Sequence, residues 1–243
     1  MSTPTLSEAG TAHRLLLACF PKSGSTFLAA ILSNLPGFRK VPLVPAYGRR
    51  EQELDMICLD AAQRAGGHYV AQHHVRYSEE TRRLIDLCSL HPIVLVRNIY
   101  DVVASVRDHL KTRGTIIAQA YVPSDLPLWP DPAIEQFIAE LIVPWYFNFY
   151  ASWSQCPTRI ELTYETLVAE PFSVVRHLCD RTSISATDAQ LRTALATAGA
   201  NPQSTRFNAG ICGRGQHINP AATAHIAKLA LYYDFLNLSA LGL

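Results

Sequence analysis

A short polar stretch follows the first strongly apolar run of the chain, and its residue types can hold an anion. The stretch reads CFPKSGSTF (residues 19–27), between RLLLA and LAAILSNL. Its polar residues and its glycine are Lys22, Ser23, Gly24, Ser25 and Thr26. Because a helix N-terminus presents unpaired N–H groups and partial positive charge, a turn of this kind at a helix start predicts an anion site. The order differs from the nucleotide loop G-x-x-x-x-G-K-[ST], since the lysine precedes the only glycine.

Three further groups of polar residues come at the ends of apolar runs of strand length. They are His73 and His74, then Arg97, then Tyr164 with Glu165. In open parallel sheets, ligands bind at the carboxyl ends of the strands, so these residues and the first stretch predict one composite site. Each also has a simpler interpretation. Arg97 can pair with Asp101 one helical turn later, and strand alternation sends only one of the two histidines to a given face.

Strands and helices alternate along the chain, which predicts a single α/β domain with a central parallel sheet flanked by helices. The expected strands cover residues 14–20, 68–75, 92–98 and 159–165. Helices are expected over 27–35, 51–65, 79–90, 100–110, 133–155 with an interruption at Pro144, 171–182, 186–198 and from Asn219-Pro220 onward. Ser78 and Pro171 are typical of helix starts. We expect a loose tail over 1–12, a variable insertion over 38–66, a long functional loop over 112–132 and a glycine-containing loop over 201–219.

Composition excludes several classes of protein. The 243 residues are 49% hydrophobic and 17% charged, which suits a folded core, and a net charge of +1 argues against a broad nucleic-acid surface. The six cysteines form no C-x-x-C pair and no zinc spacing, so they predict buried thiols in a reducing compartment. We see neither a signal peptide nor an apolar run long enough to span a membrane, and we expect a cytoplasmic protein.

Four motifs together resemble the sulfotransferases that use 3′-phosphoadenosine-5′-phosphosulfate (PAPS). KSGSTF is similar to the 5′-phosphosulfate loop of that family, and VLVRNIYDVVASV resembles its 3′-phosphate element, an arginine followed eight residues later by a serine. ELTYETLVAEP and RFNAGICGRG are similar to its Y-E-x-[LM]-x-x-x-P stretch and its late phosphate loop. The matches keep the family's order and span residues 14–218, so the chain is identified as a member with a P-loop-like, cytosolic-type sulfotransferase domain over 13–243.

The resemblance implies roles for individual residues. Lys22, together with residues 23–26, would hold the 5′-phosphate and stabilise the charge that grows on it, without a metal. Arg97 and Ser105 would bind the 3′-phosphate, and Phe27 would pack against adenine. His74, which precedes Val75 as the family's base precedes an apolar residue, would take the acceptor's proton, and His73 fits that pattern less well. The resemblance also places Tyr164, Arg206, Gly210 and Arg214 among the donor-binding residues.

The chain departs from the family pattern in places. Asn208-Ala209-Gly210 stands where the late loop usually carries Arg-Lys-Gly, and either Arg206 or Arg214 can supply the missing charge. Gln72 stands where a lysine often precedes the base by two residues. The C-terminal dimer segment of animal cytosolic members is not recognisable, which leaves the oligomeric state open.

The sequence leaves two alternative functions possible, and it does not identify the acceptor. A P-loop-like kinase or hydrolase needs magnesium and normally an acidic residue after an apolar strand, where this chain has Arg97-Asn98. A non-catalytic nucleotide-binding module would not need both Lys22 and a strand-end histidine. The acceptor would be a small-molecule, glycan or lipid hydroxyl, enclosed by segments 38–66 and 107–132, whose Tyr47, Tyr121, Leu126, Leu128 and Trp129 suit a partly apolar alcohol or phenol.

Overall fold

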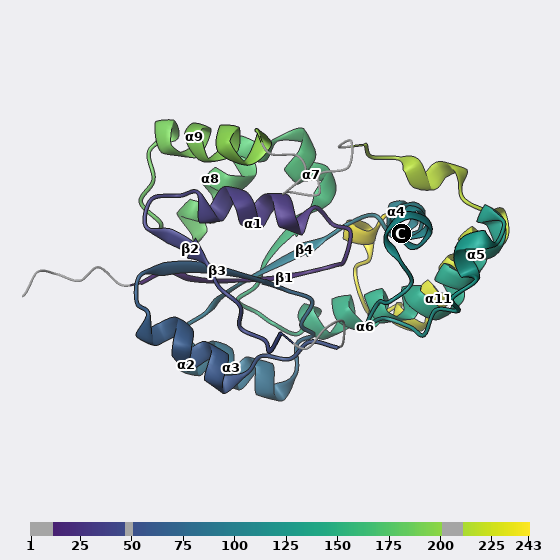
Figure 1. The fold of residues 1–243 in the computed structure, drawn as a ribbon, viewed down its shortest axis with the longest axis horizontal. Helices are drawn as coiled ribbons and strands as arrows, with labels where there is room; N and C mark the ends of the chain where they lie inside the picture. The colour runs from purple at the N-terminus through teal and green to yellow at the C-terminus, as the bar shows by residue number, and fades with distance from the viewer. Residues whose placement is uncertain (1–11, 47–50, 201–210) are drawn as a thin grey trace, which may run out of the picture.

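A five-stranded parallel sheet runs through the middle of the molecule (Figure 1). The computed structural model describes residues 12–46, 51–200 and 211–243. The strands are β1 (Arg14–Cys19), β2 (Phe38–Lys40), β3 (His68–His73), β4 (His91–Val96) and β5 (Ile160–Thr163), in the order β2-β3-β1-β4-β5. Every neighbouring pair is parallel. The predicted α/β architecture is confirmed.

The central strand is apolar from Leu15 to its end because helices cover both faces of the sheet. Leu15, Leu17 and Cys19 of β1 face one hydrophobic cluster, whereas Leu16 and Ala18 face the other, and all five are fully buried. A strand with two buried faces has no place for alternating polar residues. After Arg14 at the start of the strand, the next polar side chains therefore come past its carboxyl end, where the chain leaves the sheet.

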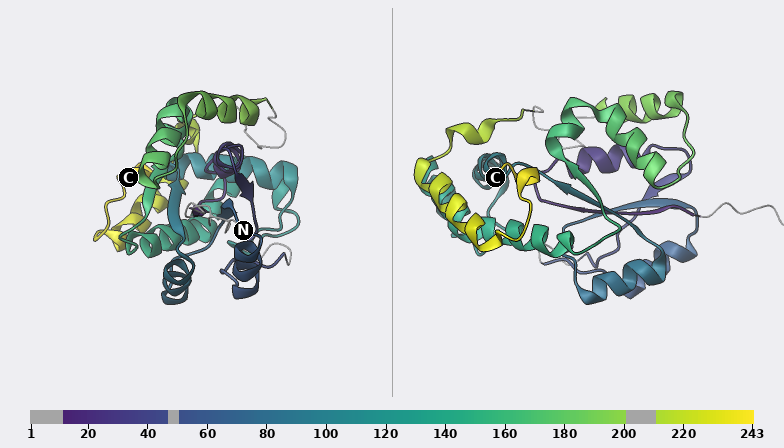
Figure 2. Two further views of the ribbon diagram at one scale, coloured as in Figure 1. Left: turned by 90° about the vertical axis from the view of Figure 1, so that its left-hand side faces the viewer. Right: turned by 180° about the vertical axis from the view of Figure 1, so that it is seen from behind.

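Two layers of helices enclose the sheet (Figures 1 and 2). One face carries α1 (Ser25–Ser33), α7 (Tyr164–Ala169), α8 (Pro171–Arg181) and α9 (Asp188–Gly199). The other carries α2 (Met56–Arg64), α3 (Glu79–Cys88) and α6 (Val143–Ser154). The helix α4 (Ile99–Arg113) adds to the same hydrophobic cluster from the carboxyl end of the sheet. Beyond the carboxyl edge of the sheet lie α5 (Asp131–Phe137) and α11 (Pro220–Ala230). The short helical segments are η1 (Leu126–Leu128), η2 (Ile138–Ile142), η3 (Arg214–His217), η4 (Leu231–Tyr233) and η5 (Ser239–Leu241).

Several helices begin where capping residues and a first-turn proline in the sequence predict. The Ser78 hydroxyl accepts a hydrogen bond from the Thr81 N–H at the start of α3, and the Asn219 side chain does the same for Ala221 in α11. Pro171 lies in the first turn of α8, where its missing N–H costs no helical hydrogen bond.

Three elements differ from the sequence-based expectation. β2 was not predicted, because three residues carry too little periodicity to read. β5 ends at Thr163, whose hydroxyl caps α7, so Tyr164 and Glu165 begin a helix rather than end a strand. The helical segment expected over 133–155 is interrupted by the π-helical η2, upstream of Pro144. Pro144 itself lies in the first turn of α6. Proline has no N–H to donate to the carbonyl four residues earlier, so the α-helical pattern of hydrogen bonds is interrupted before it. The π-helical segment lies in that interval and ends two residues before Pro144.

Parts of the expected organisation lie outside the described residues. These are the tail up to residue 11, Tyr47, and residues 201–210 of the late loop, which include Arg206 and Gly210. Among the helices that the structure describes, none is both long and apolar enough to cross a membrane.

Candidate active site

The loop between β1 and α1 is held in a tight, strained turn. The Ser23 hydroxyl donates to the Phe20 carbonyl at 2.7 Å, and the Phe20 N–H donates to Leu95 of β4 at 3.0 Å. Lys22 and Gly24 both adopt left-handed backbone conformations, with φ of 70° and 77°. A left-handed conformation is costly for lysine, which has a Cβ, so the loop shape is imposed by its surroundings. No side chain of the described residues caps α1, whose Phe27 and Leu28 N–H groups both donate to the Gly24 carbonyl, at 3.0 and 3.2 Å.

Tyr164 joins this loop to the arginine at the end of β4. A Cβ built on Gly24 would lie 2.8 Å from Cδ2 of the Tyr164 ring, so only glycine lets the loop approach the ring this closely. The guanidinium of Arg97 lies over the same ring, 4.0 Å from its centroid. The aromatic side chain therefore contacts both predicted phosphate elements and fixes their separation.

Arg97 is 5% exposed, yet one of its donors has no partner. Its Nη1 donates to the Lys22 carbonyl at 3.0 Å, and its Nη2 donates to the Ile211 carbonyl at 3.2 Å and approaches Asp101 at 3.4 Å. Within the described part of the chain, the buried Nε has no hydrogen-bond partner. A buried guanidinium donor without an acceptor is costly, which favours an anion as the missing partner. The alternative pairing with Asp101 does form, but it leaves this donor unsatisfied.

Asp101 holds the described part of the late loop, residues 211–217, against α4. Its carboxylate is 1% exposed and accepts hydrogen bonds from the N–H groups of Gly213, at 2.9 Å, and Gly215, at 2.7 Å. A Cβ on Gly215 would lie 2.4 Å from Tyr100, so the loop can only lie here with glycine at this position. Sequence reasoning treated Asp101 only as a partner of Arg97, because nothing local indicates a bond to a loop more than 100 residues later.

The other predicted donor residues lie on α1, on α4 and in η3, or outside the described chain. Ser105 is 5% exposed and follows Asp101 by one turn, on the same face of α4. Phe27 is partly buried on α1, at the margin of the cluster beneath α8 and α9. Arg214 forms an ion pair with Asp108 on α4, whereas Arg206 and Gly210 lie outside the described residues.

His73 and His74 point to opposite faces of the sheet, as strand alternation predicts. His73 is buried, and its Nε2 accepts a hydrogen bond from the Leu43 N–H at 2.8 Å. Burial, followed by the neighbouring charges of His74 and Lys40, lowers the pKa of His73 to about 4. The ring of His74 lies on the α1 face, beside the residue that precedes the loop, with Nδ1 2.8 Å from the Cys19 carbonyl oxygen.

The contact with Cys19 determines the tautomer of His74. A carbonyl oxygen can only accept, so Nδ1 carries the proton and Nε2 of the neutral ring carries a lone pair. Burial lowers the pKa of His74, and the hydrogen bond to the Cys19 carbonyl acts against that effect. Near neutral pH the ring is therefore an uncharged base with a fixed orientation. Burial also raises the pKa of the Cys19 thiol to about 12, so this thiol stays protonated.

Residues 12–205 match the family model of the sulfotransferase domain. The chain belongs to the sulfotransferase family. No curated protein sequence is significantly similar to it. Its fold is shared by the mouse sulfotransferase SULT7A1 complexed with PAP, at a TM-score of 0.68 and 14% identity, covering 95% of this chain and 87% of that one. Retinol dehydratase in a complex with retinol and PAP matches at 0.60 and 12% identity, covering 90% and 80%. Sulfotransferase STF9 from Mycobacterium avium matches at 0.56 and 12% identity, covering 94% and 78%.

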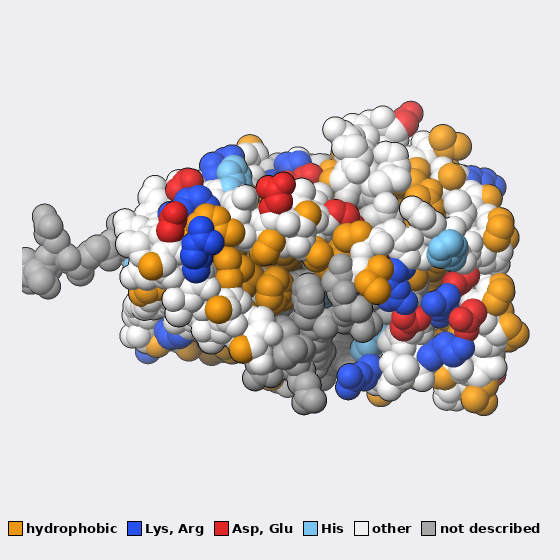
Figure 3. Space-filling model, turned by 90° about the horizontal axis from the view of Figure 1, so that it is seen from above, with side chains coloured by type: hydrophobic (Ala, Val, Ile, Leu, Met, Phe, Trp, Pro, Cys, Tyr) orange, Lys and Arg blue, Asp and Glu red, His pale blue; other side chains and the backbone are white. Residues whose placement is uncertain are grey.

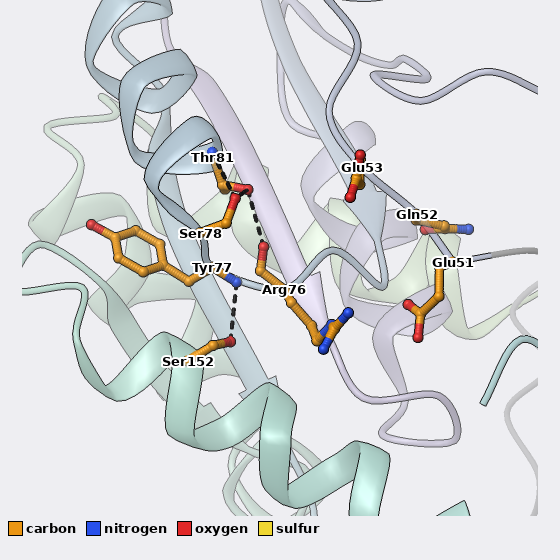
Figure 4. A pocket seen from close by; sticks show the side chains of 8 residues that line it. All are labelled: Glu51, Gln52, Glu53, Arg76, Tyr77, Ser78, Thr81 and Ser152. Atoms are coloured by element: carbon orange, nitrogen blue, oxygen red, sulfur yellow. Dashed lines mark hydrogen bonds between the residues drawn. The ribbon is translucent and has the colours of Figure 1, made fainter. Parts of the chain in front are cut away.

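A pocket of about 240 Å³ lies just past the carboxyl end of β3 in this sulfotransferase (Figure 4). It is enclosed by segment 51–53, the turn between β3 and α3, and α6. Its lining is polar: Glu51, Gln52, Glu53, Arg76, Tyr77, Ser78, Thr81 and Ser152. The Gln52 side chain accepts a hydrogen bond from the His74 N–H at 2.7 Å, so the pocket adjoins the backbone of the predicted base. Residues 51–53 of segment 38–66 thus form part of the wall of this pocket, and the role of the segment in enclosing an acceptor stays a prediction.

On the face of the sulfotransferase that Figure 3 shows, charged side chains of both signs are mixed, and acidic and basic ones lie next to one another. Among the described residues, no group of three or more histidine, cysteine, aspartate or glutamate side chains is arranged to hold a metal ion.

Proposed function

We propose that this sulfotransferase moves a sulfuryl group from PAPS to a hydroxyl of an acceptor, with His74 as the base. The observation that carries the proposal is the contact between the two predicted phosphate elements. Arg97, a buried cation whose Nε has no partner among the described residues, donates a hydrogen bond to the Lys22 carbonyl inside the loop. One ligand with two phosphate groups would satisfy both elements at once.

The residues present fit such a donor. The N–H groups at the start of α1 and the ammonium of Lys22 would hold the 5′-phosphate and stabilise its growing charge. Arg97 and Ser105, both 5% exposed, would hold the 3′-phosphate, with Phe27 against the adenine. The late loop would close the site from the side of Asp101, with Arg206 and Gly210 as further proposed contacts. Arg214 would act from its ion pair with Asp108 rather than as an unpaired cation.

His74 would supply the proton acceptor. PAPS supplies an activated sulfuryl group, whose bond to the 5′-phosphate breaks as a bond to the acceptor oxygen forms. The acceptor's proton moves to Nε2, the nitrogen that the contact with Cys19 leaves unprotonated. The low pKa that burial gives His74 keeps the ring ready for this step at neutral pH.

The acceptor would lie against segments 38–66 and 107–132. The first of these lines the polar pocket of Figure 4, and the second presents strongly exposed Tyr121 and Leu128. One wall suits hydroxyl-rich groups and the other suits apolar ones. We therefore propose a small-molecule, glycan or lipid hydroxyl.

A test of the donor compares the binding of 3′-phosphoadenosine 5′-phosphate (PAP) and 5′-AMP by calorimetry. A charge-assisted contact to the 3′-phosphate should favour PAP by at least about 1.5 kcal/mol, or more than about tenfold. Arg97→Met should remove that preference. Arg192→Met is the matched control, because Arg192 also stacks on an aromatic ring, that of Phe172, but lies on α9. Equal affinity of the wild-type protein for both nucleotides would contradict the proposal, and ATP hydrolysis that strictly requires magnesium would support the kinase alternative.

A further inference from the structure

A chain of hydrogen bonds leads from the edge of the sheet to the loop after β1. Lys40, the last residue of β2, donates from Nζ to Oε1 of Gln72 on β3 at 3.1 Å. Gln72 donates from Nε2 to the hydroxyl of Ser25 at 2.9 Å. Ser25 is the first residue of α1 and is 5% exposed, whereas Lys40 is exposed to solvent.

We propose that Lys40 is a positioning residue of the donor site, which acts through Gln72 to direct the Ser25 hydroxyl toward the 5′-phosphate. This inference rests on the proposed function for its ligand.

Chemistry fixes the donor and the acceptor in both hydrogen bonds that link Lys40, Gln72 and Ser25. An ammonium can only donate, so Oε1 of Gln72 must face Lys40 and its NH₂ group must face Ser25. The amide can then only donate, so the Ser25 oxygen accepts and its own hydrogen points elsewhere. Ser25 follows Gly24 in the loop and is the first residue of α1, the end of a helix at which N–H groups can bind an anion. The other hydrogen-bonding neighbour of Ser25 is the sulfur of Cys19, a weak acceptor, so an anion at the start of α1 would be the better partner for this hydrogen.

The pleat of the sheet explains why these residues meet. β2 and β3 are parallel, with Lys40 opposite Val70. Gln72 and His74 share with Val70 the face of β3 that α1 covers, because side chains alternate along a strand. One face of β3 therefore carries both Gln72, which relays the hydrogen bonding from Lys40 to Ser25, and His74, the predicted base.

The charge of Lys40 also acts on neighbouring groups inside the protein. Burial raises the pKa of Cys19 to about 12, and the hydrogen-bonding groups of Ser25 and Gln72 and the charge of Lys40 act against that rise. Lys40 likewise contributes to the lowered pKa of His73. Hydrogen bonds in a chain polarise one another, so a cation at one end makes the Ser25 hydroxyl a stronger donor at the other.

A lysine on an edge strand also has a simpler role, since such residues discourage pairing with other chains. A purely protective lysine would not affect nucleotide binding. A merely structural one would weaken every nucleotide alike. The proposal instead predicts an effect restricted to ligands that carry a 5′-phosphate.

The test measures the affinities of 5′-AMP and 3′-AMP by calorimetry. Lys40→Met should weaken 5′-AMP about two- to fivefold, the range expected for an exposed charge, and leave 3′-AMP unchanged. Lys40→Arg should retain most of the affinity, because it keeps a cationic donor. Lys228→Met, which removes an exposed lysine from α11, is the matched control and should change neither affinity.

A second variant tests the relay itself. Lys40→Met combined with Gln72→Lys places the ammonium directly beside Ser25, and it should restore 5′-AMP affinity at least to the wild-type value. Wild-type 5′-AMP binding by Lys40→Met, an equal loss for both nucleotides, or no recovery in the double variant would overturn the inference. Because these comparisons need no preference for PAP, they remain decisive if the proposed donor proves wrong.

Discussion

Nδ1 of His74 donates a hydrogen bond to the main-chain oxygen of Cys19 at 2.8 Å, and this contact fixes both the tautomer and the orientation of the ring. His73, one residue earlier, uses its Nε2 to accept from the Leu43 N–H on the other face of the sheet. Only His74 therefore keeps an unprotonated nitrogen on the side of the loop after β1.

His74→Asn should lower sulfuryl transfer by about 10² to 10⁴, the usual contribution of a general base, and leave PAP affinity intact. His73→Asn should mainly lower stability, because it disturbs the hydrogen bond to Leu43. Single-turnover transfer from PAPS, measured with PAP binding for both variants, checks this. An active His74→Asn enzyme beside an inactive, folded His73→Asn enzyme would reverse the assignment.

Lys22 combines a costly backbone conformation with a proposed role in the transition state. Lys22→Ala should lower turnover about a hundredfold or more, by analogy with the loss of one oxyanion donor. Lys22→Gly should lose as much activity but unfold at a higher temperature than Lys22→Ala, because glycine adopts a φ of 70° without a Cβ clash. Thermal unfolding and turnover of the two variants check the prediction. Unchanged turnover in both would remove Lys22 from the mechanism.

Gly24→Ala should damage the site through Tyr164. The new methyl group would lie 2.8 Å from the ring that supports Arg97, so both stability and PAP affinity should fall. Gly66→Ala is the matched control, since Gly66 has a similar φ of 64° and open space around its Cβ position. Any loss beyond that of the control measures the contact with Tyr164. Equal losses in the two variants would show that the ring moves aside freely.

Stability should decrease as the pH falls from about 6.5 to about 4. The pKa of His73 is about 4 in the folded protein, against about 6.5 in the unfolded chain, so the unfolded state binds more protons across this window. The contribution of His73 is complete above pH 6.5 and is lost as the ring protonates, which also breaks its bond with Leu43. Burial also lowers the pKa of His13, His74 and His91. These three histidines therefore add to the loss of stability as the pH falls.

Urea unfolding between pH 7.5 and 4 measures this dependence. The free energy of unfolding of His73→Asn should vary less steeply with pH than that of the wild-type protein. Parallel curves for the two proteins would assign the pH dependence to other groups.

The order of motifs and elements could be predicted from the sequence because its signals are local. The apolar run of β1, the caps at Ser78 and Asn219, and the polar residues at strand ends each depend on a few neighbouring positions. Strand alternation likewise predicted that His73 and His74 face opposite ways.

Only the tertiary structure decided which partners these residues meet. The three residues of β2 form a strand because β3 lies beside them, and their last member, Lys40, thereby reaches Gln72. Arg97 finds the carbonyls of Lys22 and Ile211, at separations of 75 and 114 residues. Such contacts depend on strand order and loop docking, which long-range packing selects among arrangements that local sequence signals leave equally open.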